Sequence, residues 1–557
     1  MLARARCGCA SCPMPTARPR TTACTDGREG PLWTTGETTM MYRHRLLSTA
    51  VLSAGLALGN ALPAMAESVV RMALNADIRG TNPGVTRDGN TDQVHGHIVE
   101  GLVTYASDFS IIPMLAESYE VSDGGRTHTF TLRQGVKFHN GAEMTAQDVE
   151  WSWNRLAGEA SESHCKNFFN GQNNINVTSA KAVDDHTFVI TLEEPYAVFL
   201  ATMARFDCGS MAVLHPESVN ADGSWNTPIG TGPYKMGDHA PGRYVELKRF
   251  ADYASRDEAP NGYGGGKHAS VDTLRWEIVG EGAVSKTALQ AGDLDLVTID
   301  AMTASELRDQ PGFTVDATES AVWDTYLLNS DDPLLSDVRI RRAIAHAIDP
   351  QRIMAAITEG FGAASPSPVP PMSVNFTDVQ AQYPEYDVER AKALLQEAGY
   401  DGEEIIILAT RRNGAYYERA LMAQAMMMEA GLNAKLEVVE WGTQLEAYRN
   451  GTGYHMQSFT FSPRLHAGLS FEMFTGDAQR KAWKNPEAVA LVNESLRVGD
   501  PEALQAVIDK LHQGFIDEIP AIGLGHRTLF TGMSDKIGGF ENWGAGLLRG
   551  WMLTVNG

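Results

Sequence analysis

The sequence predicts a globular α/β protein that does not span a membrane, and three observations support this description. Its 557 residues are 43% hydrophobic and 21% charged, with 53 glycines, which is ordinary globular composition. Short strand patterns alternate with helical patterns throughout the part of the chain after residue 66. That part has no stretch of about 20 apolar residues, so no membrane span is predicted within it.

The first clear elements lie between residues 127 and 156. Residues 127–132 (THTFTL) alternate in character and predict a strand, which Gly135 ends. Thr145 is a candidate helix N-cap, and Asp148 follows it at the spacing of a capping box. The next apolar side chains recur at helical spacing and predict a buried face made of Val149, Trp153 and Leu156.

Two more helices are predicted downstream. One covers Val338 to Ile348, and the other begins at Asp387 and ends at Gly399, each with apolar residues on one face. Residues 365–371 (SPSPVPP) are rich in proline, and we expect them to cross the surface rather than to link free domains.

The first 66 residues have the pattern of an export signal preceded by an extension. A basic start at Arg43 to Arg45 precedes an apolar core, 46–58, and the small-x-small sequence Ala64-Met65-Ala66. We therefore expect a signal peptide over 41–66 and a periplasmic product. Residues 1–40 lack apolar periodicity, and we interpret them as a misassigned start of translation.

The charge balance excludes some partners. The chain has 46 Lys and Arg against 69 Asp and Glu, for a formal charge of −23. Nucleic-acid backbones and anionic membrane surfaces favour basic patches, so neither is expected as a partner.

The cysteines divide into two groups. Four of the six lie within residues 1–40, which leaves Cys165 and Cys208. An even pair in an exported chain predicts a disulfide, although two separate buried thiols stay open as the alternative. No cysteine directly follows the apolar core, so no lipid anchor is expected.

The search for catalytic and metal motifs is negative. The sequence contains no G-x-S-x-G elbow and no H-E-x-x-H pair. The glycine-rich segment 262–267 precedes His268 where a Walker motif needs Ser or Thr, and we expect a flexible surface loop there. His95 and His97 stand two residues apart in a helical segment and so point to different faces. No metal site, catalytic residue or cofactor is predicted.

Six segments carry a resemblance to a known family. They are 113–123, 127–138, 145–149, 230–235 (GTGPYK), 337–343 (DVRIRRA) and 391–400 (AKALLQEAGY). In this order they resemble the signature of the family 5 extracellular solute-binding proteins, the periplasmic receptors of peptide and nickel ABC importers. The resemblance extends from about Val69 to about Trp551.

The resemblance implies a bilobed periplasmic-binding-protein fold of type II, with an extra subdomain in lobe I and two crossover strands as the hinge. Lobe I would comprise 67–103, 223–325 and 529–557, the extra subdomain 104–222, and lobe II 326–528. Cys165 and Cys208 would both lie in the extra subdomain, which is compatible with a bond between them.

The resemblance also implies a ligand site between the lobes. Trp441 follows an acidic residue, as in the oligopeptide-binding branch, and Phe461-Ser462-Pro463-Arg464 matches an aromatic-Cys-Ala-Asp segment. The aspartate of that branch pairs with the amine of the bound peptide, and here Arg464 stands in its place. The other expected lining residues are Arg87, Gly89, Trp323, Tyr326 and His466. Ordinary interlobe core for Trp441 and Phe461, and a solvated or internally paired charge for Arg464, are the alternatives.

We therefore expect the solute-binding protein of an ABC importer, not an enzyme, that delivers a peptide-like or other polar organic solute to a permease and ATPase complex. Arg464 predicts an anionic group on the ligand, because a guanidinium repels an amine and pairs with carboxylate or phosphate. A monomer is expected. A periplasmic hydrolase and a ligand receptor for a membrane sensor are the alternatives.

Overall fold

The computed structural model describes residues 67–86, 88–172, 175–411, 414–478 and 480–556. The chain divides into two units, Met1–Met65 and Ala66–Gly557, and the described residues all belong to the second. The predicted extension (1–40), the predicted signal peptide (41–66) and Arg87 lie outside the described residues. Within the described ranges, no helix combines the length and the apolar character that a membrane crossing needs.

A ten-stranded mixed sheet is the main structural element of this unit, which confirms the α/β class. Its strands, in spatial order, are β14 (Asn433–Val438), β13 (Glu404–Ala409), β15 (Met456–Phe461), β12 (Phe313–Leu328), β16 (Ala521–Ser534), β11 (Leu296–Thr298), β1 (Val69–Leu74), β10 (Thr273–Ile278), β9 (Tyr244–Arg249) and β8 (Tyr234–Ala240).

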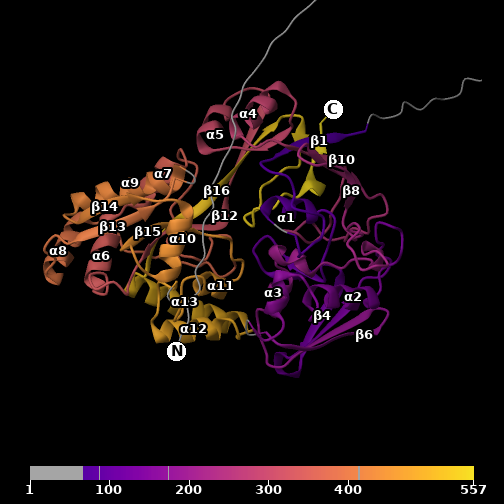
Figure 1. Cartoon of the computed structure of the whole chain (residues 1–557), viewed down its shortest axis with the longest axis horizontal. Helices are drawn as coiled ribbons and strands as arrows, with labels where there is room; N and C mark the ends of the chain where they lie inside the picture. Colours follow the sequence, from indigo (N-terminus) through magenta and orange to yellow (C-terminus); the bar gives the residue numbers. More distant parts are fainter. Residues whose placement is uncertain (1–66, 87, 173–174, 412–413, 479, 557) are drawn as a thin grey trace, which may run out of the picture. The chain divides into compact units, whose positions relative to one another are not determined.

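Two long antiparallel strands, β12 and β16, lie side by side in the middle of this sheet (Figure 1). Residues 323–328 of β12 pair with β15, and residues 531–533 of β16 pair with β11, so the two strands join the two ends of the sheet. Their pairing is irregular between Glu319 and Trp323 and again between Asp324 and Thr325. These strands are the two crossovers that the sequence led us to expect.

A separate four-stranded antiparallel sheet precedes the crossovers in the chain. It consists of β4 (Ala116–Ser122), β5 (Thr127–Leu132), β7 (Thr187–Leu192) and β6 (Val177–Asp184), with α2 (Ala146–Ala157) beside it (Figure 1). Thr145 and Asp148 form the predicted capping box at the start of α2. The helix buries the predicted residues Val149, Trp153 and Leu156.

The remaining helices are α1 (Gly89–His95), α3 (Phe199–Met203), α4 (Gly282–Ala291), α5 (Ala301–Leu307), α6 (Val338–Ala347), α7 (Pro350–Ile357), α8 (Val388–Ala398), α9 (Gly414–Glu429), α10 (Trp441–Asn450), α11 (Ala467–Glu472), α12 (Pro486–Ser495) and α13 (Pro501–Glu518). Both predicted ends of the helix α8 are confirmed. Asp387 caps its first turn, and Gly399 ends it with a left-handed φ of 77°. Two short hairpins pair β2 (Val103–Tyr105) with β3 (Ile111–Pro113), and β17 (Ile537–Gly538) with β18 (Thr554–Val555).

The proline-rich stretch 365–371 does not cross the surface as expected. Ser367 and Val369 are fully buried, because the segment packs against β16. The Ser365 amide donates to the Leu524 carbonyl, and the Ser367 carbonyl lies 3.1 Å from Nε2 of His526. Proline favours extended backbone but does not decide exposure, so the surface prediction was wrong.

The glycine-rich segment 262–267 is also buried rather than a flexible surface loop. Nζ of Lys267 lies 2.8 Å from a Glu100 carboxylate oxygen and 4.6 Å from the ring centre of Trp551. A buried ion pair needs surrounding structure to hold it, and the glycines let the backbone approach closely enough.

Candidate functional site

A cavity of about 420 Å³ brings together segments that are far apart in the sequence. They are the start of α1, the end of β2, residues 205–207, the loop 462–465 with Leu469 of α11, and residues 545–547. The lining residues are Gly89, Asp92, Tyr105, Arg205, Phe206, Asp207, Ser462, Pro463, Arg464, Leu465, Leu469, Ala545, Gly546 and Leu547. The cavity is large enough for a small organic ligand, and its lining includes two arginines, Arg205 and Arg464, and two aspartates, Asp92 and Asp207.

Arg464 lies in the loop between β15 and α11. Its Nη1 donates to the carbonyl of Pro463 at 3.0 Å, and no ion pair joins it to a carboxylate of any residue that the structure describes. Burial lowers the pKa of Arg464, the positive charge of Arg205 lowers it further, and the negative charges of Asp207 and Glu472 oppose this shift. Among the described residues, Asp207 and Glu472 therefore act on the Arg464 charge only from beyond ion-pair distance.

Arg205 is a second cation in the lining, and it is paired. Its Nε and Nη2 donate to the two carboxylate oxygens of Asp207 at 2.9 and 2.7 Å, and its guanidinium lies 4.3 Å from the ring centre of Phe168. Burial alone would lower the pKa of Arg205, but the bonds and charge of Asp207 raise it above its ordinary value. The two-pronged pair orients both side chains.

Three of the predicted site residues line this cavity, namely Gly89, Ser462 and Arg464. His466 lies beside it at the start of α11, where its Nδ1 accepts from the amide of Gly468 at 3.2 Å. Burial lowers the pKa of His466 to about 4, so this side chain is neutral at pH 7.

The predicted aromatic residues lie in or against the core instead of lining the cavity. Trp323 and Tyr326 are fully buried on β12, and Trp323 stacks on Phe461 of the neighbouring strand at 6.0 Å between ring centres. Trp441 is half-buried against Phe459. For Trp441 and Phe461 this is the alternative of core packing that the sequence left open. A ligand contact by any of these rings stays a prediction.

Sequence reasoning missed the wall that Arg205, Phe206 and Asp207 form. These residues lie in the predicted extra subdomain, for which no site was expected, and no local pattern marks them. The one available signal is their position directly before Cys208, whose bond to Cys165 is present in the structure.

Both ring nitrogens of His97 contact backbone groups inside the protein. Its Nε2 accepts from the amide of Gly550 at 2.9 Å, and its Nδ1 lies 2.9 Å from the Gln93 carbonyl. Among the described residues, no group of three or more His, Cys, Asp or Glu side chains is placed to hold a metal ion.

A mixed sheet with two crossover strands, and a polar cavity built from both halves of the chain, define the class of bilobed solute-binding proteins. The sequence model of the bacterial extracellular solute-binding proteins, family 5 middle, matches residues 110–478. The chain belongs to this family. It is the solute-binding protein of an ABC importer, as the sequence predicts.

Two curated relatives and one solved structure illustrate the likeness. The dipeptide-binding protein of Escherichia coli (strain K12) is 26% identical over 506 residues, covering 83% of this chain and 90% of the relative. The glutathione-binding protein GsiB of Salmonella typhi is 26% identical over 410 residues, covering 72% of this chain and 75% of the relative. The structure of HbpA2 from Haemophilus parasuis has the same fold, with a TM-score of 0.76 at 23% identity over 88% of this chain and all of that one.

Proposed function

We propose that the protein binds a small solute carrying an anionic group in the cavity beside Arg464 and delivers it, chemically unchanged, to a permease and its ATPase. The observation that carries the proposal is Arg464 in the cavity lining, outside any ion pair among the described residues, whereas the other arginine of the lining, Arg205, is paired with Asp207. Arg205 comes from the predicted extra subdomain and Arg464 from predicted lobe II.

The electrostatics favour an anion over a cation. Arg464 is partly desolvated, so an ammonium group beside it would meet a like charge where screening by water is weak. A carboxylate or phosphate would instead accept two parallel hydrogen bonds from the planar fork. The Salmonella typhi relative is named for glutathione, a tripeptide with two carboxylates, which fits this ligand class.

We also propose the division implied by the resemblance: lobe I (67–103, 223–325 and 529–557), the extra subdomain (104–222) and lobe II (326–528). The four-stranded sheet of β4, β5, β7 and β6 falls inside the second range, and β13, β14 and β15 fall inside the third. Export to the periplasm by the signal 41–66, the absence of a lipid anchor and a monomeric state complete the proposal.

Calorimetry tests the ligand class. S-methylglutathione serves as the acidic probe, because it has the two carboxylates of glutathione and no free thiol, and Ala-Lys-amide serves as the basic probe. We expect the wild type to prefer S-methylglutathione. A charge-assisted hydrogen bond contributes roughly 1.5–3 kcal/mol, so Arg464→Ala should weaken binding by at least about tenfold. Arg464→Lys should recover only part of the loss, because a point charge cannot reproduce the fork.

The matched control is Arg352→Ala on α7, an exposed arginine outside the cavity lining, which should bind like the wild type. Tighter binding of Ala-Lys-amide, or unchanged binding by Arg464→Ala, would overturn the anionic-ligand proposal. Mass spectrometry of the recovered probe should find it intact, and a cleaved probe would contradict the non-enzymatic role.

A further inference from the structure

We propose that the Cys165–Cys208 disulfide is a positioning element of the ligand cavity, because it holds the Arg205–Asp207 pair in the cavity wall. The inference rests on the proposed function, in which this cavity takes the solute. It assigns the bond a role in binding in addition to any contribution to the stability of the fold.

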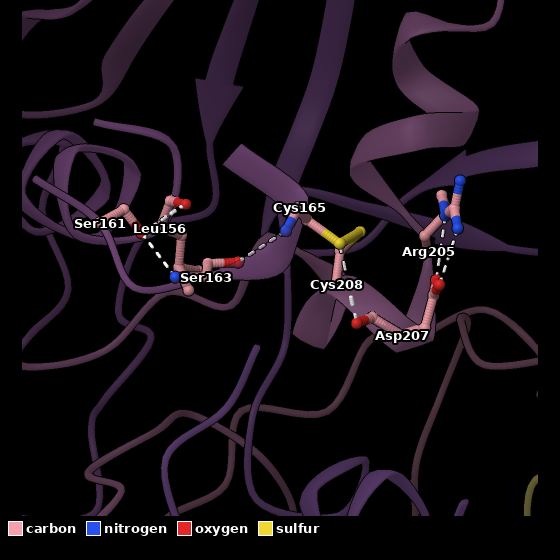
Figure 2. Close-up of a disulfide and its surroundings, with 7 residues drawn as sticks. All are labelled: Leu156, Ser161, Ser163, Cys165, Arg205, Asp207 and Cys208. Carbon is pink, nitrogen blue, oxygen red and sulfur yellow. Dashed lines mark hydrogen bonds and ion pairs between the residues drawn. A yellow bond between two sulfur atoms is a disulfide. The ribbon is translucent and has the colours of Figure 1, made fainter. Parts of the chain in front are cut away.

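One end of the disulfide, Cys208, directly follows the cavity wall formed by residues 205–207. Cys208 is the residue after Asp207, and it is joined to Cys165 across 43 residues of sequence, with the two Cα atoms 5.5 Å apart. Figure 2 shows the disulfide and the two hydrogen bonds of the Arg205–Asp207 pair next to each other. Both cysteines are buried, so the bond is a covalent cross-link inside the protein.

Cys165, at the other end of the disulfide, is connected to α2 by a chain of three hydrogen bonds. The Cys165 amide donates to Oγ of Ser163 at 3.2 Å, and the Ser163 amide donates to Oγ of Ser161 at 3.0 Å. The Ser161 hydroxyl donates to the Leu156 carbonyl in the last turn of α2 at 2.9 Å (Figure 2). Cys165 is therefore tied to a capped, well-packed helix.

The same short segment holds the pair at a second point. Cys165 and Phe168 both belong to the 3₁₀ turn η2 (His164–Phe168), and the guanidinium of Arg205 lies over the Phe168 ring. Asp207 is thus held through the bond to its neighbour Cys208, and Arg205 through its contact with Phe168. Rigid support of this kind is what keeps a charged binding group in place.

The chain after Cys208 is strained and needs restraint. Gly209, Ser210 and Met211 have φ values of 63°, 54° and 45°, and the last two are not glycines. Left-handed backbone at a non-glycine residue persists only where the surroundings enforce it. Gly101 makes room for the segment, because a Cβ atom there would lie 2.1 Å from the Ser210 carbonyl oxygen. Without the disulfide, we expect the backbone of residues 209–211 to relax, and this movement to displace Asp207 and Arg205.

The test compares the wild type with a Cys165→Ala, Cys208→Ala double variant by hydrogen exchange. The amides of Cys208 and Ser210 donate to the Arg205 carbonyl, and the Ala212 amide donates to the Gly209 carbonyl. We expect faster exchange over 205–212 and unchanged exchange in β5 and β7. A uniform rise across the four-stranded sheet, or no change over 205–212, would overturn the inference whether or not a probe binds.

A double-mutant cycle supplies the binding readout. Loss of the disulfide should weaken S-methylglutathione binding by about tenfold in the wild type, but by less than about twofold in an Arg205→Ala background. Equal losses in both backgrounds would show that the bond does not act through Arg205. Ile190→Val in the core of β7 is the control for a general loss of stability, and its affinity should be unchanged. A wild type that binds no S-methylglutathione would count against the proposed function, while the hydrogen-exchange comparison would still decide the positioning role.

Discussion

At the scale of single residues, the cavity lining combines Arg464 with Arg205 and Asp207, which lie about 260 residues earlier in the chain. Arg464 was found because its segment matches a ligand-pairing segment of the family that the sequence resembles. Arg205 and Asp207 carry no such mark, and only folding brings them to the same cavity. Trp323 was expected in the site but packs against Phe461 in the core. The sequence does not separate these two cases, because a tryptophan packs well both in a core and against a ligand.

Histidines with lowered pKa values make the stability of the protein sensitive to acid. Burial lowers the pKa of six of them from the ordinary 6.5 to about 4; these are His95, His97, His128, His139, His466 and His526. Between pH 6.5 and 4 the unfolded chain binds more protons than the folded chain. The stabilisation is therefore complete above about pH 6.5 and is lost as the pH falls toward 4.

His128→Leu should weaken this pH dependence. His128 is buried against Phe199, and leucine has a similar volume without a titrating ring. The free energy of unfolding should fall less between pH 7 and pH 4 in the variant than in the wild type, by up to about 3 kcal/mol. Urea unfolding at the two pH values measures it. The exposed control His268→Gln should follow the wild type, and an equal fall in His128→Leu would refute the assignment.

At the scale of elements, the ends of helices were predictable because their signals are local. Thr145 and Asp148 at α2, and Asp387 and Gly399 at α8, act within one turn of the chain. The burial of 365–371 was not predictable, because it depends on β16, which lies about 150 residues later in the sequence.

The contact between that proline-rich segment and β16 requires a glycine at position 523. A Cβ atom there would lie 1.9 Å from the carbonyl oxygen of Pro366, which is backbone and cannot rotate away. Gly523→Ala should therefore destabilise the protein by about 1–3 kcal/mol or more. Thermal unfolding measures the change. Gly282→Ala at the start of α4 meets nothing within 4 Å and should be close to neutral, so equal effects of the two substitutions would contradict this account.

At the scale of the whole molecule, the class of fold was predictable but its topology came from the resemblance. Alternating strand and helix patterns indicate an α/β protein, yet they do not tell which strands cross between the two ends of the sheet. β12 and β16 pair over separations of about 200 residues, and the cavity joins segments from α1 to residue 547. Such contacts leave no local pattern, so the cavity itself needed the structure.

The central claim is that this solute-binding protein takes an anionic solute beside Arg464. The most direct measurement is mass spectrometry of the small molecule that copurifies with the exported protein and is released on denaturation. We predict a carboxylate- or phosphate-bearing solute at close to one per chain in the wild type, and its loss from Arg464→Ala. A released solute that is cationic or uncharged, or an anion retained equally by Arg464→Ala, would contradict the account.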